Sequence, residues 1–278
     1  MRVAEPIPAL DSDLPFDRLL DIEDVQPLRP AYFLMRSHSQ NLEDAMLYRA
    51  LKHVQAGTYI DVGAWHPQLH SVTKWFYDNG WSGVNVEPSR KFFRLLQNRR
   101  PRDINLNIAL GRQEGAMDFF EVGYTGLSSL GKGSVDLGRR LGFRKARTYP
   151  VEVRTMAQLF ADHVRSEEVH FLKIDVEGFE SDVLAGFDWH KNRPWIVVVE
   201  AVRPGSNEDD WAHWEPDILV SGYEFVWFDG LNRFYVREES AMLKKHFRVP
   251  INLFDGVSIP WFQNAVSSSE LRLRSLLD

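Results

Sequence analysis

The stretch that decides the fold is Thr58-Tyr59-Ile60-Asp61-Val62-Gly63, an apolar run that carries one carboxylate and closes on a glycine. A short run of this kind, rich in β-branched and aromatic residues, predicts a buried strand. A helical pattern follows over residues 71–79 and ends at Gly80. A strand followed at once by a helix is the repeating unit of a parallel α/β sheet.

The same unit recurs along the chain. Further strands are predicted over residues 83–88, 104–110, 117–122, 169–175 and 195–200, and further helices between residue 41 and Gly57 and over residues 89–98 and 180–185. Near the end, two strand-like runs flank Asp229-Gly230-Leu231-Asn232, which is a hairpin signal. The sequence therefore predicts an α/β fold with a doubly wound, mostly parallel sheet of seven strands and an antiparallel C-terminal hairpin.

The chain divides into three predicted parts. Residues 1–40, rich in proline and acids, are expected to form an N-terminal extension, residues 41–239 hold the α/β units, and residues 240–278 form a C-terminal tail. Within the domain, residues 123–149 carry six glycines and six lysines or arginines with little periodicity. A long loop inside a domain is often functional, so we expect an inserted lid that either recognises an anionic acceptor or is simply solvated.

Composition excludes several classes of protein. The 278 residues include no cysteine, which rules out disulfides, zinc–thiolate sites and a thiol nucleophile. A net charge of −6 argues against a nucleic-acid partner. The most continuous apolar run, residues 195–199, is far shorter than the roughly 20 residues that span a bilayer, and the first 24 residues lack a signal-peptide pattern. We therefore expect a cytoplasmic protein without a transmembrane segment, and leave open whether it forms a homo-oligomer.

Polar residues stand where the predicted strands end. Ligands of open α/β sheets bind beyond the carboxyl ends of the strands. The residues at these positions are Asp61 with Gly63, Glu87, Asn107 with Ala109, Asp175 with Glu177, and Glu200. Any single carboxylate could be a helix cap. Four of five strand ends with a carboxylate together indicate a ligand site.

The turn Gly63-Ala64-Trp65-His66-Pro67 separates two cofactor classes. A dinucleotide site needs the pattern G-x-G-x-x-G, because its backbone must approach a pyrophosphate. Here only Gly63 is present, which disfavours an NAD enzyme. S-adenosylmethionine has no phosphates, so one glycine suffices beside its methionine tail, and Glu87 would accept hydrogen bonds from the ribose hydroxyls.

The chain resembles the FkbM-type methyltransferases over roughly residues 59–236. The most specific block is Phe171-Leu172-Lys173-Ile174-Asp175-Val176-Glu177-Gly178-Phe179-Glu180, followed by Val183-Leu184-Ala185-Gly186. Other blocks lie at residues 61–64, 86–88, 107–111 and 127–130. The first loop departs from the family, because Trp65 and Pro67 replace its usual asparagine and glycine.

The resemblance implies a Rossmann-like class I methyltransferase that uses S-adenosylmethionine. The implied cofactor residues are Asp61, Gly63 and Ala64 on the methionine side, Glu87 at the ribose, and Asn107 and Ala109 near the adenine. The stretch from Asp229 to Tyr235 resembles one in members that accompany glycosyltransferases. It favours O-methylation of a sugar, in a glycan or sugar nucleotide of polysaccharide biosynthesis, with a glycosyltransferase as a possible partner.

Methyl transfer to a hydroxyl needs a group that removes the hydroxyl proton. Asp175 is the first candidate for this base and Glu177 and Glu200 are the second, while His70, like His66, could serve because histidine titrates near neutrality. Asp175 and Glu200 could instead hold Mg²⁺. The altered loop motivates one alternative of another class, an inactive methyltransferase-like scaffold that partners a glycosyltransferase.

Overall fold

The computed structural model describes residues 34–123, 125–143, 146–166 and 168–259. Its centre is a seven-stranded sheet, built from β2 (Thr58–Val62), β3 (Ser82–Val86), β4 (Ile104–Leu106), β8 (Phe171–Ile174), β9 (Ile196–Glu200), β10 (Tyr223–Phe228) and β11 (Asn232–Arg237). The strand order is β10-β11-β9-β8-β2-β3-β4. Neighbours from β9 to β4 pair in parallel, whereas β11 pairs antiparallel with both β9 and β10. The α/β class and the C-terminal hairpin are confirmed, and the sheet is a mixed one.

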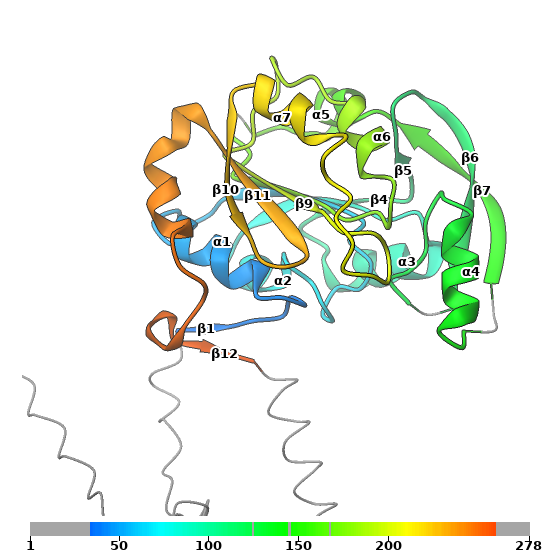
Figure 1. Ribbon diagram of the computed structural model, residues 1–278, viewed down its shortest axis with the longest axis horizontal. Helices are drawn as coiled ribbons and strands as arrows, with labels where there is room; N and C mark the ends of the chain where they lie inside the picture. The colour runs from blue at the N-terminus through cyan, green and yellow to red at the C-terminus, as the bar shows by residue number, and fades with distance from the viewer. Residues whose placement is uncertain (1–33, 124, 144–145, 167, 260–278) are drawn as a thin grey trace, which may run out of the picture.

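Helices cover both faces of this sheet (Figure 1). One face carries α1 (Glu43–Leu51), α2 (Lys74–Asp78), α3 (Arg90–Arg99) and the 3-10 helix η4 (Glu238–Phe247). The other face carries α5 (Met156–His163), α6 (Glu180–Ala185) and α7 (Glu215–Val220). The sequence analysis did not predict α5 or α7.

Neighbouring residues of the central strands supply two separate cores. Tyr59 and Phe171 pack with the apolar side chains of α1 and α2, whereas Ile60 and Leu172 pack with those of α5 and α6. All four side chains are fully buried. Successive side chains of a strand point to opposite faces, so a strand covered by helices on both faces has to be apolar throughout. This explains the continuous apolar runs in the sequence.

A second sheet of three strands stands beside the first, in the order β5 (Ala109–Leu110), β7 (Ala146–Arg154) and β6 (Gly115–Val122). The predicted single strand over residues 104–110 is therefore wrong. It divides at Asn107, whose side-chain amide donates 2.9 Å hydrogen bonds to the carbonyls of Glu87 and Pro88. Before that point the chain pairs with β3, and after it with β7.

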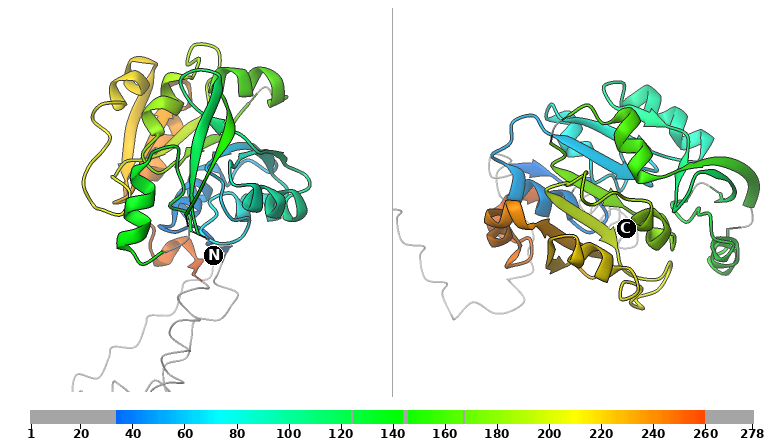
Figure 2. Two further views of the ribbon diagram at one scale, coloured as in Figure 1. Left: turned by 90° about the vertical axis from the view of Figure 1, so that its right-hand side faces the viewer. Right: turned by 90° about the horizontal axis from the view of Figure 1, so that it is seen from above.

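The sequence predicts a long loop without secondary structure over residues 123–149, and the structure shows that this prediction is wrong. The segment contains the helix α4 (Gly133–Arg140) and the start of β7, and α4 packs beside the long β6–β7 hairpin (Figure 2). A Cβ on Gly138 would lie 2.4 Å from Cγ1 of Val122. The glycines of this segment that read as loop signals thus include one that permits close helix–strand packing. That this segment acts as a lid over the site stays a prediction.

Parts of the predicted extension and tail meet on the domain. β1 (Met35–Arg36) pairs in parallel with β12 (Val257–Ser258), and the short 3-10 helix η5 (Leu253–Asp255) precedes β12. Arg49 of α1 bonds to Asp255 and to the carbonyl of Val249 at 2.7 Å, which fastens this region to the helix. The rest of both predicted segments, residues 1–33 and 260–278, lies outside the described residues. No described helix is long and apolar enough to cross a membrane, and the cytoplasmic location stays a prediction.

A buried carboxylate ties the first strands together. Asp103 accepts hydrogen bonds from the Tyr59 hydroxyl at 2.7 Å, the Gly83 backbone N–H at 2.9 Å and the Asn85 amide at 3.0 Å. The Arg100 guanidinium lies 3.8 Å away and is itself almost wholly buried. Since a buried charge is tolerated only when it is paired and hydrogen-bonded, these contacts act as one unit.

The same arginine reaches the loop that follows β2. Arg100 Nη2 donates to the carbonyl of Pro67 at 2.7 Å and to the Ser71 hydroxyl at 3.0 Å. The end of α3 therefore holds the loop that the sequence assigns to the cofactor.

Replacement of the central carboxylate tests this network. Asp103→Ala should lower the free energy of unfolding by about 3–5 kcal/mol, because it leaves three donors buried without their acceptor and removes the carboxylate that pairs with the buried Arg100. Denaturant unfolding followed by circular dichroism measures the change. Asp136→Ala on α4 is the control, because Asp136 is exposed and its one ion pair among the described residues is with exposed Arg139, and it should unfold like the wild type. Equal stability of the two variants would contradict the prediction.

Candidate functional site

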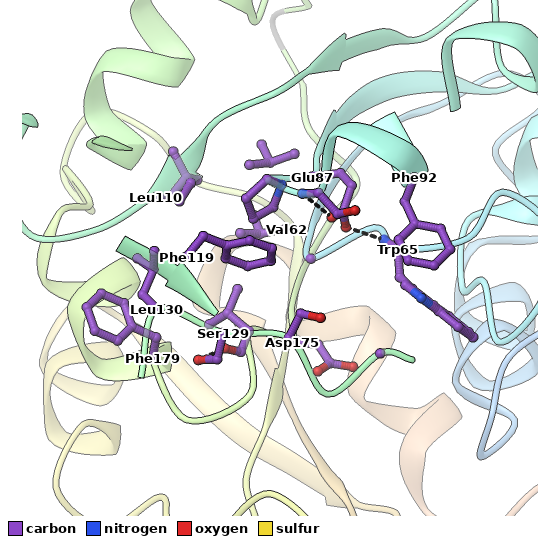
Figure 3. Close-up of a pocket in the computed structure, with 18 of the residues that line it drawn as sticks. Val62, Trp65, Glu87, Phe92, Leu110, Phe119, Ser129, Leu130, Asp175 and Phe179 are labelled. Atoms are coloured by element: carbon purple, nitrogen blue, oxygen red, sulfur yellow. Dashed lines mark hydrogen bonds between the residues drawn. The ribbon is translucent and has the colours of Figure 1, made fainter. Parts of the chain in front are cut away.

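A cavity opens at the carboxyl ends of β2, β3 and β8, where the sequence placed the ligand site (Figure 3). Its empty volume is about 550 Å³, part of which is open to solvent. Gly63, Glu87 and Asp175 line it from the three strand ends, and Phe119 of β6 and Leu130 line it from the second sheet and the segment that follows. Clefts that combine apolar walls with a few polar groups are the usual binding sites of small molecules.

Gly63 brings the ends of two strands into contact. Its φ is +83°, and a Cβ at this position would lie 1.8 Å from the carbonyl oxygen of Asp175. The Gly63 N–H donates to the Val86 carbonyl at 3.0 Å, and the Asp175 N–H donates to the Val62 carbonyl at 3.0 Å. Only glycine allows this backbone conformation and this approach together. The lone glycine of the sequence motif is thus explained by the close approach of the two chain segments that leave the parallel strands β2 and β8.

Glu87 lies in the middle of the cavity wall. Its Oε2 accepts a hydrogen bond from the Trp65 N–H at 2.8 Å and its Oε1 accepts one from the Ser89 N–H at 2.7 Å. Burial raises the pKa of this carboxyl to about 7. A carboxylate has roughly four acceptor positions, so two remain free after these bonds. Glu87 can therefore accept from a pair of neighbouring hydroxyls, as on a ribose.

The two sides of Glu87 differ in character (Figure 3). On one side lie Phe119, Leu130 and Phe179, which form an apolar slot together with Ala109. A slot of this kind suits a flat base. On the other side lies Trp65, a departure from the family whose ring, from the sequence, could also stack on a sugar.

Several predicted residues stand outside the cavity lining. Asp61 is buried beneath it and accepts a 3.0 Å hydrogen bond from the Thr73 hydroxyl, while burial raises its pKa. Ala64 is buried, and its N–H donates to the Val86 carbonyl at 3.1 Å. Asn107 points to backbone carbonyls, as described above. His70 is exposed, and its ring centroid lies 5.8 Å from that of Trp65.

Carboxyl groups gather behind the cavity, at the ends of β8 and β9. Of the three predicted acids here, Asp175 lines the cavity, whereas Glu177 and Glu200 do not. Burial, followed by the charge of Asp175, raises the pKa of Glu177 to about 8. The same two causes raise the pKa of Glu200 well above its ordinary value, and Glu200 Oε2 is buried and has no hydrogen-bond partner in the described part of the chain. Glu177 also has a φ of 55°, which is rare for a residue other than glycine.

Lys173 and Glu180 complete this cluster, and the sequence analysis gave neither a role. Lys173 is buried and its ammonium group bonds to Asp175. Glu180 Oε1 accepts from the Val176 N–H at 2.9 Å, and burial raises its pKa to about 7. A lysine inside an apolar strand is rarely tolerated without a charged partner, so its place in the sequence was a signal for this pair.

Ser129 also lines the cavity. Its hydroxyl lies 2.9 Å from the Glu177 carbonyl oxygen, to which it can donate. It belongs to the family-like block Leu127-Ser128-Ser129-Leu130, so the structure gives that block a role. Next to it, α4 contacts the loop after β9, where a Cβ on Gly205 would lie 2.6 Å from Cδ1 of Leu137.

The magnesium hypothesis has no support. In the part of the chain that the structure describes, no three histidine or acidic side chains are arranged to hold a metal ion. The cation that Asp175 bonds to is the ammonium group of Lys173. Mg²⁺ is therefore not part of the proposal below.

The family follows from comparison with known sequences. A family model described as the methyltransferase FkbM domain matches residues 61–225, more than half of the chain. The chain belongs to the FkbM methyltransferase family. The match runs from Asp61 of β2 to Phe225 of β10, so it includes every strand end around the cavity of this FkbM domain.

Two solved structures are similar to this FkbM chain. One is methyltransferase FkbM from Methylobacillus flagellatus KT, at 15% identity and a TM-score of 0.40, with 66% of this chain and 44% of that chain covered. The other is a TehB-like SAM-dependent methyltransferase from Corynebacterium glutamicum ATCC 13032, at 9% identity and a TM-score of 0.39, with 70% and 87% covered. The chain thus spans less than half of the Methylobacillus protein. None of the curated proteins matches it.

Membership of the FkbM family implies S-adenosylmethionine as the methyl donor, and the cavity fits this molecule. The apolar slot matches adenine, the free acceptor positions of Glu87 match the ribose, and the Gly63 turn lines the cavity where the methionine side would lie. The cavity wall also carries the carboxylates of Glu87 and Asp175, which suit a cationic sulfonium.

The acidic cluster predicts a pH-dependent stability. A raised pKa means that the folded chain holds the Glu200 proton more tightly than the unfolded chain, so this contribution is lost as pH rises above about 4.5. Glu200→Gln carries no such charge. The variant should therefore gain stability relative to the wild type between pH 5 and pH 8, by on the order of 1 kcal/mol, as measured by denaturant unfolding at both pH values.

Glu239→Gln provides the matched control. The hydrogen bond from Arg193 lowers the pKa of Glu239 to about 2. The Glu239 contribution is lost only as pH falls from about 4.5 towards 2. Its difference from the wild type should stay constant between pH 5 and pH 8. The same constant difference for Glu200→Gln would contradict the prediction.

Proposed function

We propose that this protein is an S-adenosylmethionine-dependent O-methyltransferase that methylates a hydroxyl of a sugar, in a glycan or a sugar nucleotide. One observation supports S-adenosylmethionine as the methyl donor. The groups along one cavity follow in the order of an apolar slot, the paired acceptor positions of Glu87 and the Gly63 turn. A sugar as the acceptor is supported by the resemblance of the hairpin turn at Asp229 to members that accompany glycosyltransferases.

In this proposal the donor is held by β6 and by segments that follow the strands β2, β3, β6 and β8. Phe119, Leu130 and Phe179 take the adenine, Glu87 takes the ribose hydroxyls, and the backbone at Gly63 lies along the methionine side. When bound, S-adenosylmethionine supplies an electrophilic methyl group on a sulfonium. The task of the chain is then to aim an acceptor hydroxyl along the line of displacement and to remove its proton.

Asp175 is the group that we assign to the proton. Among the three predicted acids at the ends of β8 and β9, it is the one that lines the cavity. Its bond to the buried ammonium of Lys173 fixes the carboxyl group in one orientation. Glu177 and Glu200 stand behind it and are the second candidates for the base.

The acceptor would enter beside α4. Arg139 and Arg140 are exposed on this helix, and they would suit the phosphates of a sugar nucleotide or of a diphosphate-linked glycan. The cytoplasmic location, the place in polysaccharide biosynthesis and the glycosyltransferase partner belong to the same proposal.

A second candidate function is an inactive scaffold. The observation that favours it is the altered loop, where Trp65 has a left-handed backbone with a φ of 46° and Pro67 replaces a glycine of the family. A chain that had lost the donor site would keep the fold and present its surface to a glycosyltransferase. Binding of the donor or its product separates the two candidates.

Calorimetric titration with S-adenosylhomocysteine, the product of the donor, tests the proposal. We expect saturable one-to-one binding with micromolar affinity. Glu87→Ala should weaken it at least about tenfold, because the ribose hydroxyls lose their charged acceptor. Glu224→Ala on the edge strand β10 removes an acid far from the cavity and should leave the affinity unchanged. A wild type that does not bind would leave the scaffold as the leading candidate.

The base is tested by turnover. With labelled S-adenosylmethionine and an acceptor found in a panel of sugars, Asp175→Asn should reduce turnover by about 10²–10⁴-fold, the range for the loss of a general base. The affinity for S-adenosylhomocysteine should change little. Unchanged turnover would move the base to Glu177 or Glu200, which Glu177→Gln and Glu200→Gln then distinguish.

A further inference from the structure

The wall of the cavity contains a hydrogen-bond donor without an acceptor. Trp65 lines the cavity, and its indole Nε1 is buried and has no hydrogen-bond partner among the described residues. A buried N–H that lacks an acceptor costs free energy, so native proteins contain few of them. A buried, unpaired donor on a residue that lines a ligand cavity therefore points to an acceptor atom on the ligand.

The position of this indole is fixed from several sides. The Trp65 backbone N–H is bonded to Glu87, and the backbone has a φ of 46°. The indole packs against the ring of Phe92, with centroids 5.5 Å apart, and against that of His70 at 5.8 Å. A Cβ on Gly126 would lie 3.9 Å from the indole, in ordinary contact. Strained backbone that its surroundings hold in place is frequent at ligand sites.

The place of Trp65 indicates which part of the ligand it meets. Trp65 lies on the side of Glu87 opposite the apolar slot (Figure 3). With the ribose at Glu87 and the adenine in the slot, the amino-acid end of the donor extends towards Trp65 and the Gly63 turn. This assignment rests on the proposed function.

The charges of the cavity add a second reason. Its described lining includes the carboxylates of Glu87 and Asp175 but no lysine or arginine. A carboxylate on the ligand has to find neutral donors here. The hydroxyl of Thr125 already lies 2.7 Å from the Val122 carbonyl, and that of Ser129 lies 2.9 Å from the Glu177 carbonyl. The indole N–H has no such commitment.

We propose that the Trp65 indole N–H donates a hydrogen bond to the carboxylate at the methionine end of the donor and its product. The tryptophan is then a binding residue for this end of the ligand, in a loop whose sequence departs from the family. The described lining has no lysine or arginine to bind this carboxylate, so the neutral indole N–H binds it instead.

A pair of ligands isolates this contact. S-adenosylhomocysteine carries the carboxylate, whereas 5′-methylthioadenosine has the same adenosine and sulfur but lacks the amino-acid end. Trp65→Phe keeps an aromatic ring and removes the N–H. Calorimetry should show an affinity for S-adenosylhomocysteine about tenfold weaker in the variant, because a hydrogen bond to a charged group is lost. The affinity for 5′-methylthioadenosine should stay within about twofold of the wild-type value.

Trp189→Phe is the matched control. The Trp189 indole N–H is also buried and finds no partner among the residues that the structure describes. This residue, however, stacks on Phe187 in the core, with centroids 4.1 Å apart, and does not line the cavity. Its replacement should leave both affinities unchanged. An equal loss for both ligands in Trp65→Phe would mean that the ring acts by shape alone, and it would overturn the proposal, as would no loss for either.

A second measurement uses the wild type alone. The chain has nine tryptophans, whose indole N–H signals are resolved by nitrogen-15 NMR after tryptophan labelling. We expect one signal to move downfield with S-adenosylhomocysteine and to stay in place with 5′-methylthioadenosine. If both ligands bind and no indole signal distinguishes them, the proposal is wrong. If the wild type binds neither ligand, the proposed function fails and this inference fails with it.

Discussion

The contact on which the site depends is the close approach of two backbones, at Gly63 and Asp175, where the parallel strands β2 and β8 end. A methyl group at Gly63 would overlap the carbonyl oxygen of Asp175, so any side chain would push β2 and β8 apart. That separation would move the Gly63 turn away from Asp175, which is the carboxylate nearest to the proposed chemistry. It would also shift Trp65, whose N–H fixes Glu87. One glycine thus sets the relative positions of the groups that face the cavity.

The acidic side chains that gather at the site do not stabilise the folded chain. Burial raises the pKa of Glu87, Glu177, Glu180 and Glu200, which means that each negative charge destabilises the folded chain. Lys173 is the cation inside this group. A bound ligand with a sulfonium would add a second one, so the same electrostatics that cost stability would favour the donor. Two packed cores on either face of the sheet offset this cost.

The sequence predicted the strands of the central sheet well because each is a short apolar run with a clear stop. It predicted the place of the cavity because Gly63, Glu87 and Asp175 follow such runs. It failed at residues 104–110, where nothing local indicates that the chain leaves one sheet and joins another. It also missed α4, because glycines such as Gly138 read as loop signals in the sequence. In the structure Gly138 permits close packing of the helix on Val122.

The sequence by itself determined the class of fold, the strand ends that meet and the family. These depend on local apolar patterns and on short blocks that resemble the motifs of the family. Only the tertiary structure decided which predicted residues reach the cavity. Asp61 and Asn107 end predicted strands as Glu87 does, yet Thr73 binds the first and backbone carbonyls bind the second. Trp65 and Phe119 line the cavity from distant parts of the chain. Such contacts depend on how the elements pack, and packing joins residues whose separation along the chain carries no signal.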